Sequence, residues 1–582
     1  MFPSQTSLIP ISVAVARFIE AGNSLFTGWY PYWYLGTPAK YLLGPAIPYL
    51  LVGLHRILPF FSLFDLALIL IFLSYLIAAF GWGSLAYKIS GSRKSGFLVG
   101  FILLLLPWRL FGALAFSETT FTIARHLLPW LILAFYRYFS HKSLKRGAIA
   151  TLATAFILLI NPGIIAIVLV GLLSLILTFS FKEGKIRFRF KLLKRTLVIL
   201  AAGFLVASLW YSPGYWLTVL ANPSIGGASA AKVIVRIIDL AKAGIPLFMA
   251  VLAVFFAGKI KTKLGVFTLT WLLTFLFLSL FRFLGNPAFW MDWTSWLYEV
   301  EIGVGFLLGG WLIDVMAANG VGKGNLRKGA IYLLVIGFAF YLVWRIHLEV
   351  KGPSLISGKP PEGIAGLSTL AQMAKDKRVF LSGSTVFWAD ALYNLNQVRG
   401  GTDGAAINLW WDHAAYQLRE GEDGELAEAW LRALGVSYVL VHTDTSGEYF
   451  KDFRNLAKWR DVGKEVYGKN GDIILEMEGT SLVWEVDVAK MESLKPLSGP
   501  IDLAGLNGYI STRKRDLNME ADGNKITIQS VTPISGISLL VSYSPGWRAF
   551  GTGGQRLKVS KDILGNLLIN AGGQKEIVLL YK

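Results

Sequence analysis

The sequence predicts a helical polytopic membrane domain followed by an external α/β segment and a C-terminal β-sandwich. Three observations lead to this prediction. Hydrophobic residues make up 54% of the 582 residues and charged residues only 16%, whereas soluble domains carry about 25% charged residues. Long apolar runs follow one another from residue 65 to 347. Beyond residue 350 the apolar runs shorten to strand length, and Gly, Asp and Glu become more frequent.

The charge distribution points to a membrane rather than to nucleic acid. The net charge is +19, but residues 351–582 carry 26 Lys and Arg against 27 Asp and Glu, which leaves 30 basic and 10 acidic residues in residues 1–350. Such an excess in the hydrophobic part marks connections on one side of a membrane. The chain has no cysteine, which excludes disulfides, iron–sulfur clusters and cysteine nucleophiles.

About ten apolar runs in the predicted transmembrane domain, residues 65–347, are long enough to cross a bilayer, or nearly so. They are 65–87, 95–115, 122–138, 147–161, 163–180, 196–212, 244–258, 264–283, 302–318 and 329–347. Alternate connections are rich in Lys and Arg, as at 181–195 and 259–263, and the positive-inside rule makes these connections cytoplasmic. We therefore expect a multi-pass protein of the cell membrane with residues 348–582 outside the cell.

Residues 1–64 are predicted to form an external interfacial segment. The stretch 42–58 is apolar but is interrupted by two prolines, and eight aromatic residues precede it between positions 18 and 41. Aromatic residues at this density are typical of a membrane interface. The alternative is that 42–58 crosses the bilayer and the N-terminus is cytoplasmic, but the parity of the ten runs favours the interface.

Residues 348–479 are predicted to form an α/β domain and residues 480–582 a β-sandwich. In the first, 378–381 and 437–441 have the pattern of strands, and 426–434 has that of a helix that ends at Gly435. In the second, short strands are expected at 481–488, 525–531, 537–542, 555–559, 567–569 and 576–581. We expect Trp547 to lie in the core of this sandwich.

Few acidic residues occur in the first 350 residues, and most of them fall on the predicted outer side. They are Glu20, Glu118, Asp239, Asp292, Glu299 and Glu301, and they share that side with Arg17, Arg125, His126 and Arg282. Carboxylates at a membrane are costly and tend to be functional. A carboxylate can act as general base on an acceptor hydroxyl, and an arginine can stabilise a leaving phosphate. We expect Glu20, Glu118, Arg125 and Arg282 to converge on one outer cavity, with Glu20 or Glu118 as the base and His126 as a further proton carrier. The alternative is that these residues are solvated loop charges.

The segment 23–49 carries a pattern that resembles a known family. Gly28, Trp29, Pro31, Trp33, Gly36 and Pro38, followed by Pro45, Pro48 and Tyr49, resemble the first external loop of GT-C superfamily glycosyltransferases. The resemblance is closest to archaeal pyruvoyl-tetrahydropterin-synthase-related and YfhO-type polytopic membrane proteins. Arg399-Gly-Gly401 and residues 434–439 resemble the external α/β segment of such proteins, and residues 543–549 with 571–581 resemble their terminal β-sandwich.

The resemblance implies a polyprenyl-phosphate-linked sugar donor and a glycan, lipid or protein acceptor in the cell envelope. It also implies a catalytic Asp or Glu in the first external loop, shortly after the first span. This sequence has no span before residue 20, and Glu20 is the only carboxylate before Asp65. Either an upstream span carrying the family's acid precedes Met1, or Glu20 takes its place, or the protein is not a transferase.

Trp410-Trp411-Asp412 resembles the W-W-D-Y-G motif of oligosaccharyltransferase catalytic subunits, which binds the acceptor sequon, although His413 and Ala414 follow here. The alternatives are that the two tryptophans pack against the domain, or that they stack on a sugar ring.

The leading function is therefore transfer of a sugar from a lipid-phosphate donor on the outer face by a GT-C type glycosyltransferase. Arg17, Arg125 and Arg282 are the expected ligands of the donor phosphate, and a divalent metal, Mg²⁺ or Mn²⁺, is an optional cofactor. One alternative is a non-catalytic protein of this fold that binds a lipid-linked glycan, and another is a transporter of such a lipid. A transporter is expected to show polar residues at mid-span and paired broken helices, whereas the acids here cluster at the ends of the predicted spans. The sequence contains no phosphate-binding loop motif, and nucleic acid is not an expected partner.

Overall fold

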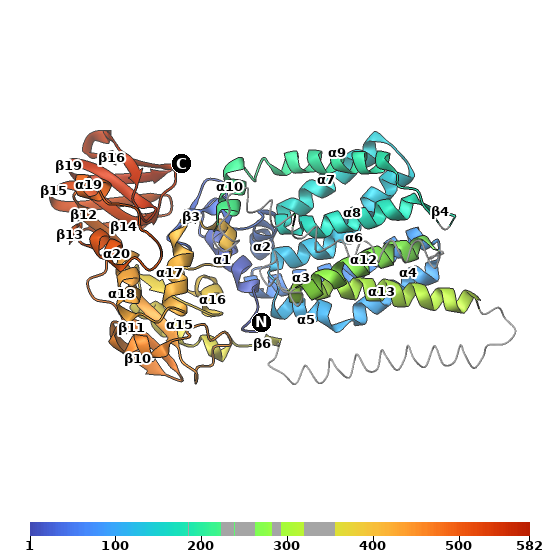
Figure 1. Cartoon of the computed structure of the whole chain (residues 1–582), viewed down its shortest axis with the longest axis horizontal. Coiled ribbons are helices and arrows are strands. Elements are labelled where there is room, and N and C mark those ends of the chain that lie inside the picture. Colours follow the sequence, from blue (N-terminus) through green and yellow to red (C-terminus); the bar gives the residue numbers. More distant parts are fainter. Residues whose placement is uncertain (184, 223–237, 239–261, 282–292, 319–354) are drawn as a thin grey trace.

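The computed structural model describes residues 1–183, 185–222, 238, 262–281, 293–318 and 355–582. The chain forms a bundle of long helices and a C-terminal half of two large sheets with short helices, and the two halves lie end to end along the long axis (Figure 1). The predicted order, with helices first, then α/β structure and then β structure, is confirmed.

The bundle contains long, strongly apolar helices. Its helices are α3 (Leu63–Ser90), α4 (Arg93–Leu105), α5 (Pro107–Ala115), α6 (Thr119–Ser140), α7 (Leu144–Ile160), α8 (Ile165–Ser180), α9 (Phe190–Ala207), α10 (Pro213–Ala221), α12 (Lys263–Phe281) and α13 (Trp293–Ala318). By length and composition, three helices of the described residues could cross a membrane: Leu63–Ser90, Pro162–Ser180 and Lys263–Leu280. The pair α4–α5, bent by 45°, makes a fourth if it is one span. The predicted runs 244–258 and 329–347 lie outside the described residues.

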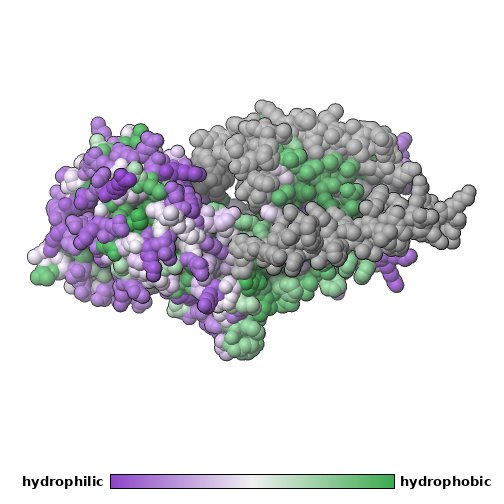
Figure 2. All heavy atoms as spheres, turned by 90° about the horizontal axis from the view of Figure 1, so that it is seen from below, coloured by the Kyte–Doolittle hydropathy of each residue, from purple (hydrophilic) through white to green (hydrophobic). Residues whose placement is uncertain are grey.

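The two ends of the bundle differ in charge. Helices α3 and α6 begin near the N-terminal residues, because the amino group of Met1 pairs with Asp65 and Ser12 bonds to Glu118. Their opposite ends are followed by basic connections, 91–94 and 141–146. The short hairpin after α8, formed by β4 (Phe181–Lys182) and β5 (Lys185–Ile186), lies at that same far end in Figure 1. Figure 2 shows a hydrophobic surface on the bundle and a largely hydrophilic one on the C-terminal half, as expected of a membrane protein with a polar domain at one end.

The N-terminal segment, residues 1–62, lies between the two halves. Strand β1 (Phe2–Pro3) pairs with β6 (Ile356–Ser357), so the first residues meet the first described strand of the C-terminal half. Two short helices follow, α1 (Ile9–Glu20) and α2 (Ala46–Ile57). Each has 12 residues and is therefore about 18 Å long, too short for a hydrocarbon core of about 30 Å. That 42–58 lies along the outer interface stays a prediction.

Glycines in two of the motifs that carry the family resemblance allow Trp29 and Trp33 to pack closely against the backbone. Strands β2 (Trp29–Tyr30) and β3 (Thr37–Pro38) form a hairpin that turns at Gly36, where φ is +90° and a Cβ would lie 2.6 Å from the Trp29 ring. A Cβ at Gly400 or Gly401 would similarly come within 2.6–2.7 Å of Trp33. The motif at residues 28–38 and the Arg399-Gly-Gly401 motif, more than 360 residues apart, are thus two sides of one contact.

The α/β domain is built on a five-stranded sheet in the order β10-β11-β9-β7-β8. Its strands are β7 (Arg378–Phe380), β8 (Asn396–Gln397), β9 (Val436–His442), β10 (Lys464–Lys469) and β11 (Asp472–Glu476), and its helices are α15 (Gly366–Met373), α16 (Thr385–Leu392), α17 (Trp410–Arg419) and α18 (Gly424–Ala433). Strands β8, β7 and β9 are parallel, and β11 and β10 are antiparallel. Every residue of β9 is buried, as expected of a central parallel strand. Helix α18 ends before Gly435, which has φ +69°, so the predicted stop is confirmed.

The C-terminal strands form one eight-stranded sheet that folds over on itself. They are β12 (Val483–Val486), β13 (Arg513–Asp516), β14 (Asn518–Asp522), β15 (Lys525–Ser542), β16 (Trp547–Gly551), β17 (Arg556–Leu557), β18 (Val559–Lys561) and β19 (Asn566–Tyr581), with helices α19 (Val488–Glu492) and α20 (Leu503–Ile510). The pairs of short strands predicted at 525–542 and at 567–581 are wrong, because each pair is one long strand, β15 and β19. These strands shift register at bulges and remain paired beyond them. Residues of both ends share one core, and Trp547, 4% exposed, lies in it as predicted.

Candidate functional site

Glu118 is the N-cap of α6. Its carboxylate accepts the backbone N–H of Thr120 (2.8 Å) and of Phe121 (2.9 Å), and the Thr120 hydroxyl (2.5 Å). The Ser12 hydroxyl (2.7 Å) and the Asn161 amide (3.4 Å) also donate to it. Five donors occupy the roughly four lone-pair sites of a carboxylate. Glu118 therefore ties α1 and the α7–α8 turn to the start of α6, and both of its carboxylate oxygens already accept hydrogen bonds from the chain.

Glu20 has a different environment. It is the last residue of α1, and its carboxylate pairs with Nδ1 of His55 from α2. Both side chains are about 30% exposed. A carboxylate next to an imidazole is a common general-base arrangement. Helix α2 also carries exposed apolar residues, among them Leu50 (43% exposed) and Ile57 (74% exposed), which are suited to contact with lipid.

Arg17 lies one helical turn before Glu20 on α1. Its Nη1 donates to the backbone carbonyl of Asp390 in α16 (3.1 Å), so it connects α1 to the α/β domain. Residues three apart on a helix share a face. Among the sequence-predicted cations, Arg17 is thus the one that shares an element with the Glu20 carboxylate.

Arg125 and Glu299 form a buried ion pair between α6 and α13. Nε of Arg125 lies 3.0 Å from Oε1 of Glu299, and Nη2 donates to Oε2 at 3.2 Å. The guanidinium carbon is 4.3 Å from the Phe121 ring centre and 5.1 Å from that of Tyr298. The Glu299 carbonyl accepts the indole N–H of Trp271 (2.7 Å). The charge of Arg125 is therefore compensated by Glu299.

Arg109 and Glu301 meet at the break between α4 and α5. Glu301 accepts the backbone N–H groups of Trp108 (3.1 Å) and Arg109 (2.9 Å), and so caps α5. The Arg109 guanidinium is fully buried, and it donates to the Leu103 carbonyl (2.7 Å) and to the Tyr298 hydroxyl (3.2 Å). Its Nε has no hydrogen-bond partner among the described residues.

His126 is also fully buried within α6. Its Nδ1 shares a hydrogen bond with the Ser74 hydroxyl (2.7 Å), whereas its Nε2 has no partner among the described residues. Its ring lies 5.8 Å from the rings of both Tyr75 and Tyr298. We call Arg109, Arg125, His126, Glu299 and Glu301 the buried polar cluster.

The structure corrects where the predicted charges lie. Glu299 and Glu301 were expected in a connection before a run at 302, but α13 begins at Trp293 and contains both. The helix can include Glu299 because Arg125 neutralises it. Arg282, Asp239 and Asp292 lie outside the described residues. Of the four residues expected to converge, Glu20, Glu118 and Arg125 each have a separate set of partners.

The two tryptophans of the Trp410-Trp411 pair differ in exposure. Trp411 is 2% exposed, and its ring packs on that of Tyr34 at 4.7 Å. It therefore presents no free face to a sugar. Trp410 is half-buried and lies 5.8 Å from the ring of Trp430 in α18. Both tryptophans therefore pack against neighbouring aromatic residues, as in the alternative that they pack against the domain.

Two residues of these sites, Arg109 and His55, were not predicted from the sequence. Arg109 stands alone in the predicted run 95–115, and a cation inside an apolar run is by itself a signal of function. His55 was not among the predicted site residues, and its pairing with Glu20 depends on the packing of α1 against α2. In the described part of the chain, no three metal-ligating side chains come together. The optional divalent metal thus has no ligand set among these residues.

Residues 44–229 match a family described as 6-pyruvoyl-tetrahydropterin synthase related domain, membrane protein. The match extends from the residues before α2 to just beyond α10 and confirms, for this part, the resemblance given by the sequence motifs. No curated protein matches the chain.

Solved structures with related shapes are large glycosyltransferases. The apo oligosaccharyltransferase of Archaeoglobus fulgidus is 14% identical over 75% of this chain and 66% of its own, with a TM-score of 0.43. The arabinofuranosyltransferase AftD from Mycobacteria is 12% identical over 100% of this chain and 56% of its own, with a TM-score of 0.46. The chain thus spans just under two thirds of the first and little more than half of the second.

Proposed function

We propose that this protein is a membrane glycosyltransferase that moves a sugar from a polyprenyl-phosphate-linked donor to an acceptor on the outer face. The observation that carries the proposal is the Glu20–His55 pair. It is a partly exposed carboxylate–imidazole pair between the bundle and the C-terminal half. Helix α2, which carries His55, also exposes the apolar side chains of Leu50 and Ile57. A lipid-linked donor and a polar acceptor would meet at such a position.

In the proposed reaction, Glu20 removes the proton from the acceptor hydroxyl. The hydroxyl oxygen attacks the anomeric carbon of the sugar, and the bond from that carbon to the phosphate oxygen breaks. Polyprenyl phosphate leaves, and the configuration at the anomeric carbon inverts. His55 holds the Glu20 carboxylate in position and can receive its proton. Arg17, which uses one N–H on the Asp390 carbonyl, has further donors for the leaving phosphate, and Arg282 is a second candidate for this role.

The test is turnover of polyprenyl-phosphate monosaccharides by the full chain in proteoliposomes, with Mg²⁺, with Mn²⁺ and with EDTA. Glu20→Gln should lower turnover at least about 100-fold, the usual contribution of a general base, while polyprenyl phosphate still binds. The matched control is Glu183→Gln. Glu183 is an exposed carboxylate, 76% exposed, between β4 and β5 at the far end of the bundle. This control should keep full activity.

Two results would reject the proposal. Equal turnover by Glu20→Gln and wild type would remove Glu20 as the base. Binding of the lipid donor without turnover of any sugar would favour the alternative of a non-catalytic protein that binds lipid-linked glycans.

A further inference from the structure

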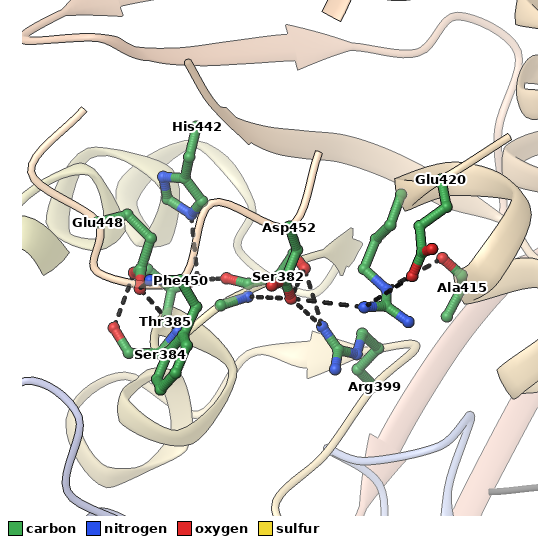
Figure 3. Close-up of polar contacts among 12 residues, drawn as sticks. Ser382, Ser384, Thr385, Arg399, Ala415, Glu420, His442, Glu448, Phe450 and Asp452 are labelled. Carbon is green, nitrogen blue, oxygen red and sulfur yellow. Dashed lines mark hydrogen bonds and ion pairs between the residues drawn. The ribbon is translucent and has the colours of Figure 1, made fainter. Parts of the chain in front are cut away.

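A second polar site lies at the carboxyl ends of the parallel strands in the α/β domain (Figure 3). From β7 the chain passes through α16 to β8 on one side, and it later returns through α17 and α18 to β9 on the other side of β7. This reversal of strand order is the position where open α/β sheets bind ligands. Residues 382–385 follow β7, and Arg399 follows β8.

In this structure the site is occupied by a carboxylate of the chain itself. Oδ2 of Asp452 accepts the Ser382 hydroxyl (2.8 Å) and the backbone N–H of Gly383 (3.2 Å). The same oxygen lies 3.4 Å from Nη1 of Arg399 and 3.6 Å from Nη1 of Arg419. Figure 3 shows Ser382 and Arg399 directed at Asp452. Arg419 is the last residue of α17.

The donors exceed what one carboxylate oxygen can use. Good charge-assisted N–H···O contacts measure about 2.7–2.9 Å, and both arginine contacts are longer. The Ser382 hydroxyl, the Gly383 N–H and two guanidinium groups all face Oδ2, although one such oxygen offers about two lone pairs. Nη1 of Arg399 makes its shorter hydrogen bond to the Ser382 hydroxyl oxygen (2.9 Å). An anion with three or four oxygens would give each donor its own acceptor.

The backbone around Asp452 is held by other contacts. Glu448, 2% exposed, accepts the Ser384 hydroxyl (2.7 Å) and the backbone N–H groups of Ser384 (3.0 Å) and Phe450 (3.0 Å). The Asp452 side chain is 25% exposed. It can therefore rotate out of the site while Glu448 keeps the segment in place.

We propose that Ser382, Gly383, Arg399 and Arg419 form a binding site for a phosphate-type oxyanion, and that Asp452 is an internal competitor which the anion displaces. The phosphate can belong to a free sugar phosphate or to a lipid headgroup, because both present the same oxygens. The inference is independent of the proposed transfer reaction, because it concerns a different domain and none of the residues assigned to that reaction.

The test measures binding of inorganic phosphate to the full chain in detergent by calorimetry. Asp452→Asn removes the competing charge and should bind phosphate at least about 10-fold more tightly than wild type. Asp461→Asn, an exposed aspartate in the neighbouring 3-10 helix, residues 456–461, makes the same charge change and should bind like wild type. Arg399→Gln combined with Asp452→Asn should lose binding. Glucose 1-phosphate and a short polyprenyl phosphate, used as competitors, distinguish a soluble source from a lipid source.

A second measurement uses wild type, in case Asp452→Asn does not fold. Phosphate at 100 mM should raise the thermal unfolding midpoint of wild type more than chloride at equal ionic strength, and Arg399→Gln should lose this difference. Equal phosphate binding by Asp452→Asn and Asp461→Asn would overturn the proposal. So would equal effects of phosphate and chloride on wild type, and the cluster would then be only a structural ion-pair network.

Discussion

Trp29 of the N-terminal segment packs against Trp547 of the C-terminal sandwich, with ring centres 5.1 Å apart. Tyr581 completes the group, at 4.9 Å from Trp29 and 5.3 Å from Trp547. The side chain of Asn524 also accepts the Trp29 backbone N–H (2.8 Å) and donates to the Thr27 carbonyl (3.0 Å). A residue near the start of the chain is therefore part of the core of its last domain.

This contact predicts that Trp29→Ala and Trp547→Ala each destabilise the C-terminal half by about 3–5 kcal/mol, the usual loss for a buried tryptophan. Because the rings touch, the double variant should lose less than the sum of the two. Chemical unfolding of the full chain measures the losses. Val531→Ala, at an 89% exposed position of β15, should change nothing. An additive double variant would contradict the direct contact.

The buried Arg125–Glu299 ion pair predicts that removing one partner destabilises the protein more than replacing both partners. Glu299→Gln leaves the Arg125 charge buried without its partner, and we expect a loss of about 3–5 kcal/mol. Replacing both residues, as in Arg125→Met with Glu299→Leu, should recover most of this loss. Thermal unfolding in detergent tests both variants, with the exposed Lys182–Glu183 pair as the control whose disruption costs almost nothing. A double variant no more stable than the single one would argue against this account.

The hydrogen bonds of Glu118 predict a structural role. Glu118→Ala removes the N-cap of α6 and should cost about 0.5–2 kcal/mol, whereas Glu118→Asp can still cap the helix and should cost less. The measurement is the unfolding midpoint, followed by turnover of any donor that wild type uses. If Glu118→Ala is fully stable but inactive, the residue is catalytic and the cap is incidental.

The raised pKa of Asp390 predicts that the stability of the C-terminal half depends on pH. Burial raises the pKa of Asp390 to about 7, although the Gln397 side chain, the Leu395 backbone N–H and the Trp33 indole donate to it and lower the pKa. The unfolded value is about 3.9, so between these two pH values the folded state retains a proton that the unfolded chain has lost. Stability from Asp390 is therefore greatest below pH 4, falls as pH rises from about 4 to 7, and is constant above that.

The decline from Asp390 amounts to at most about 4 kcal/mol, since one unit of pKa corresponds to about 1.4 kcal/mol. Unfolding midpoints measured from pH 4 to 8 should fall less steeply for Asp390→Asn than for wild type. Asp461→Asn should keep the wild-type slope. Identical slopes for Asp390→Asn and wild type would show that the Asp390 pKa is not raised.

Features encoded by local pattern were predictable from the sequence. The long apolar helix α3 and the glycine stop of α18 at Gly435 depend on neighbouring residues alone, and both lie where the sequence places them. The bent strands β15 and β19 were not predictable as single strands, because the side-chain alternation is interrupted at bulges while the hydrogen-bonded ladder continues on the partner strand. The charged run Arg513-Lys-Arg515 lies in β13, where Arg513 donates to the carbonyls of Arg432 and Ala433, and no local pattern indicates this strand.

The candidate site was predictable only in part. Scarcity of charge identified Glu20 and Glu118 as notable, but it could not reveal their partners. Glu118 accepts a hydrogen bond from Ser12, 106 residues away, and Glu20 pairs with His55, 35 residues away. Such pairings depend on how the helices pack against one another. The spacing of residues within one helix does not reveal that packing.

The position of the N-terminal segment has a consequence for synthesis. Trp29 bonds to Asn524, 495 residues later, and Ser542 bonds to the Tyr34 carbonyl across 508 residues. At about 5–20 residues per second, a ribosome needs about 25–100 s to make the chain between them. During that time the aromatic segment is already outside the ribosome without its final partners. Its retention at the lipid surface, or by a chaperone, would protect it from aggregation until the last domain is complete.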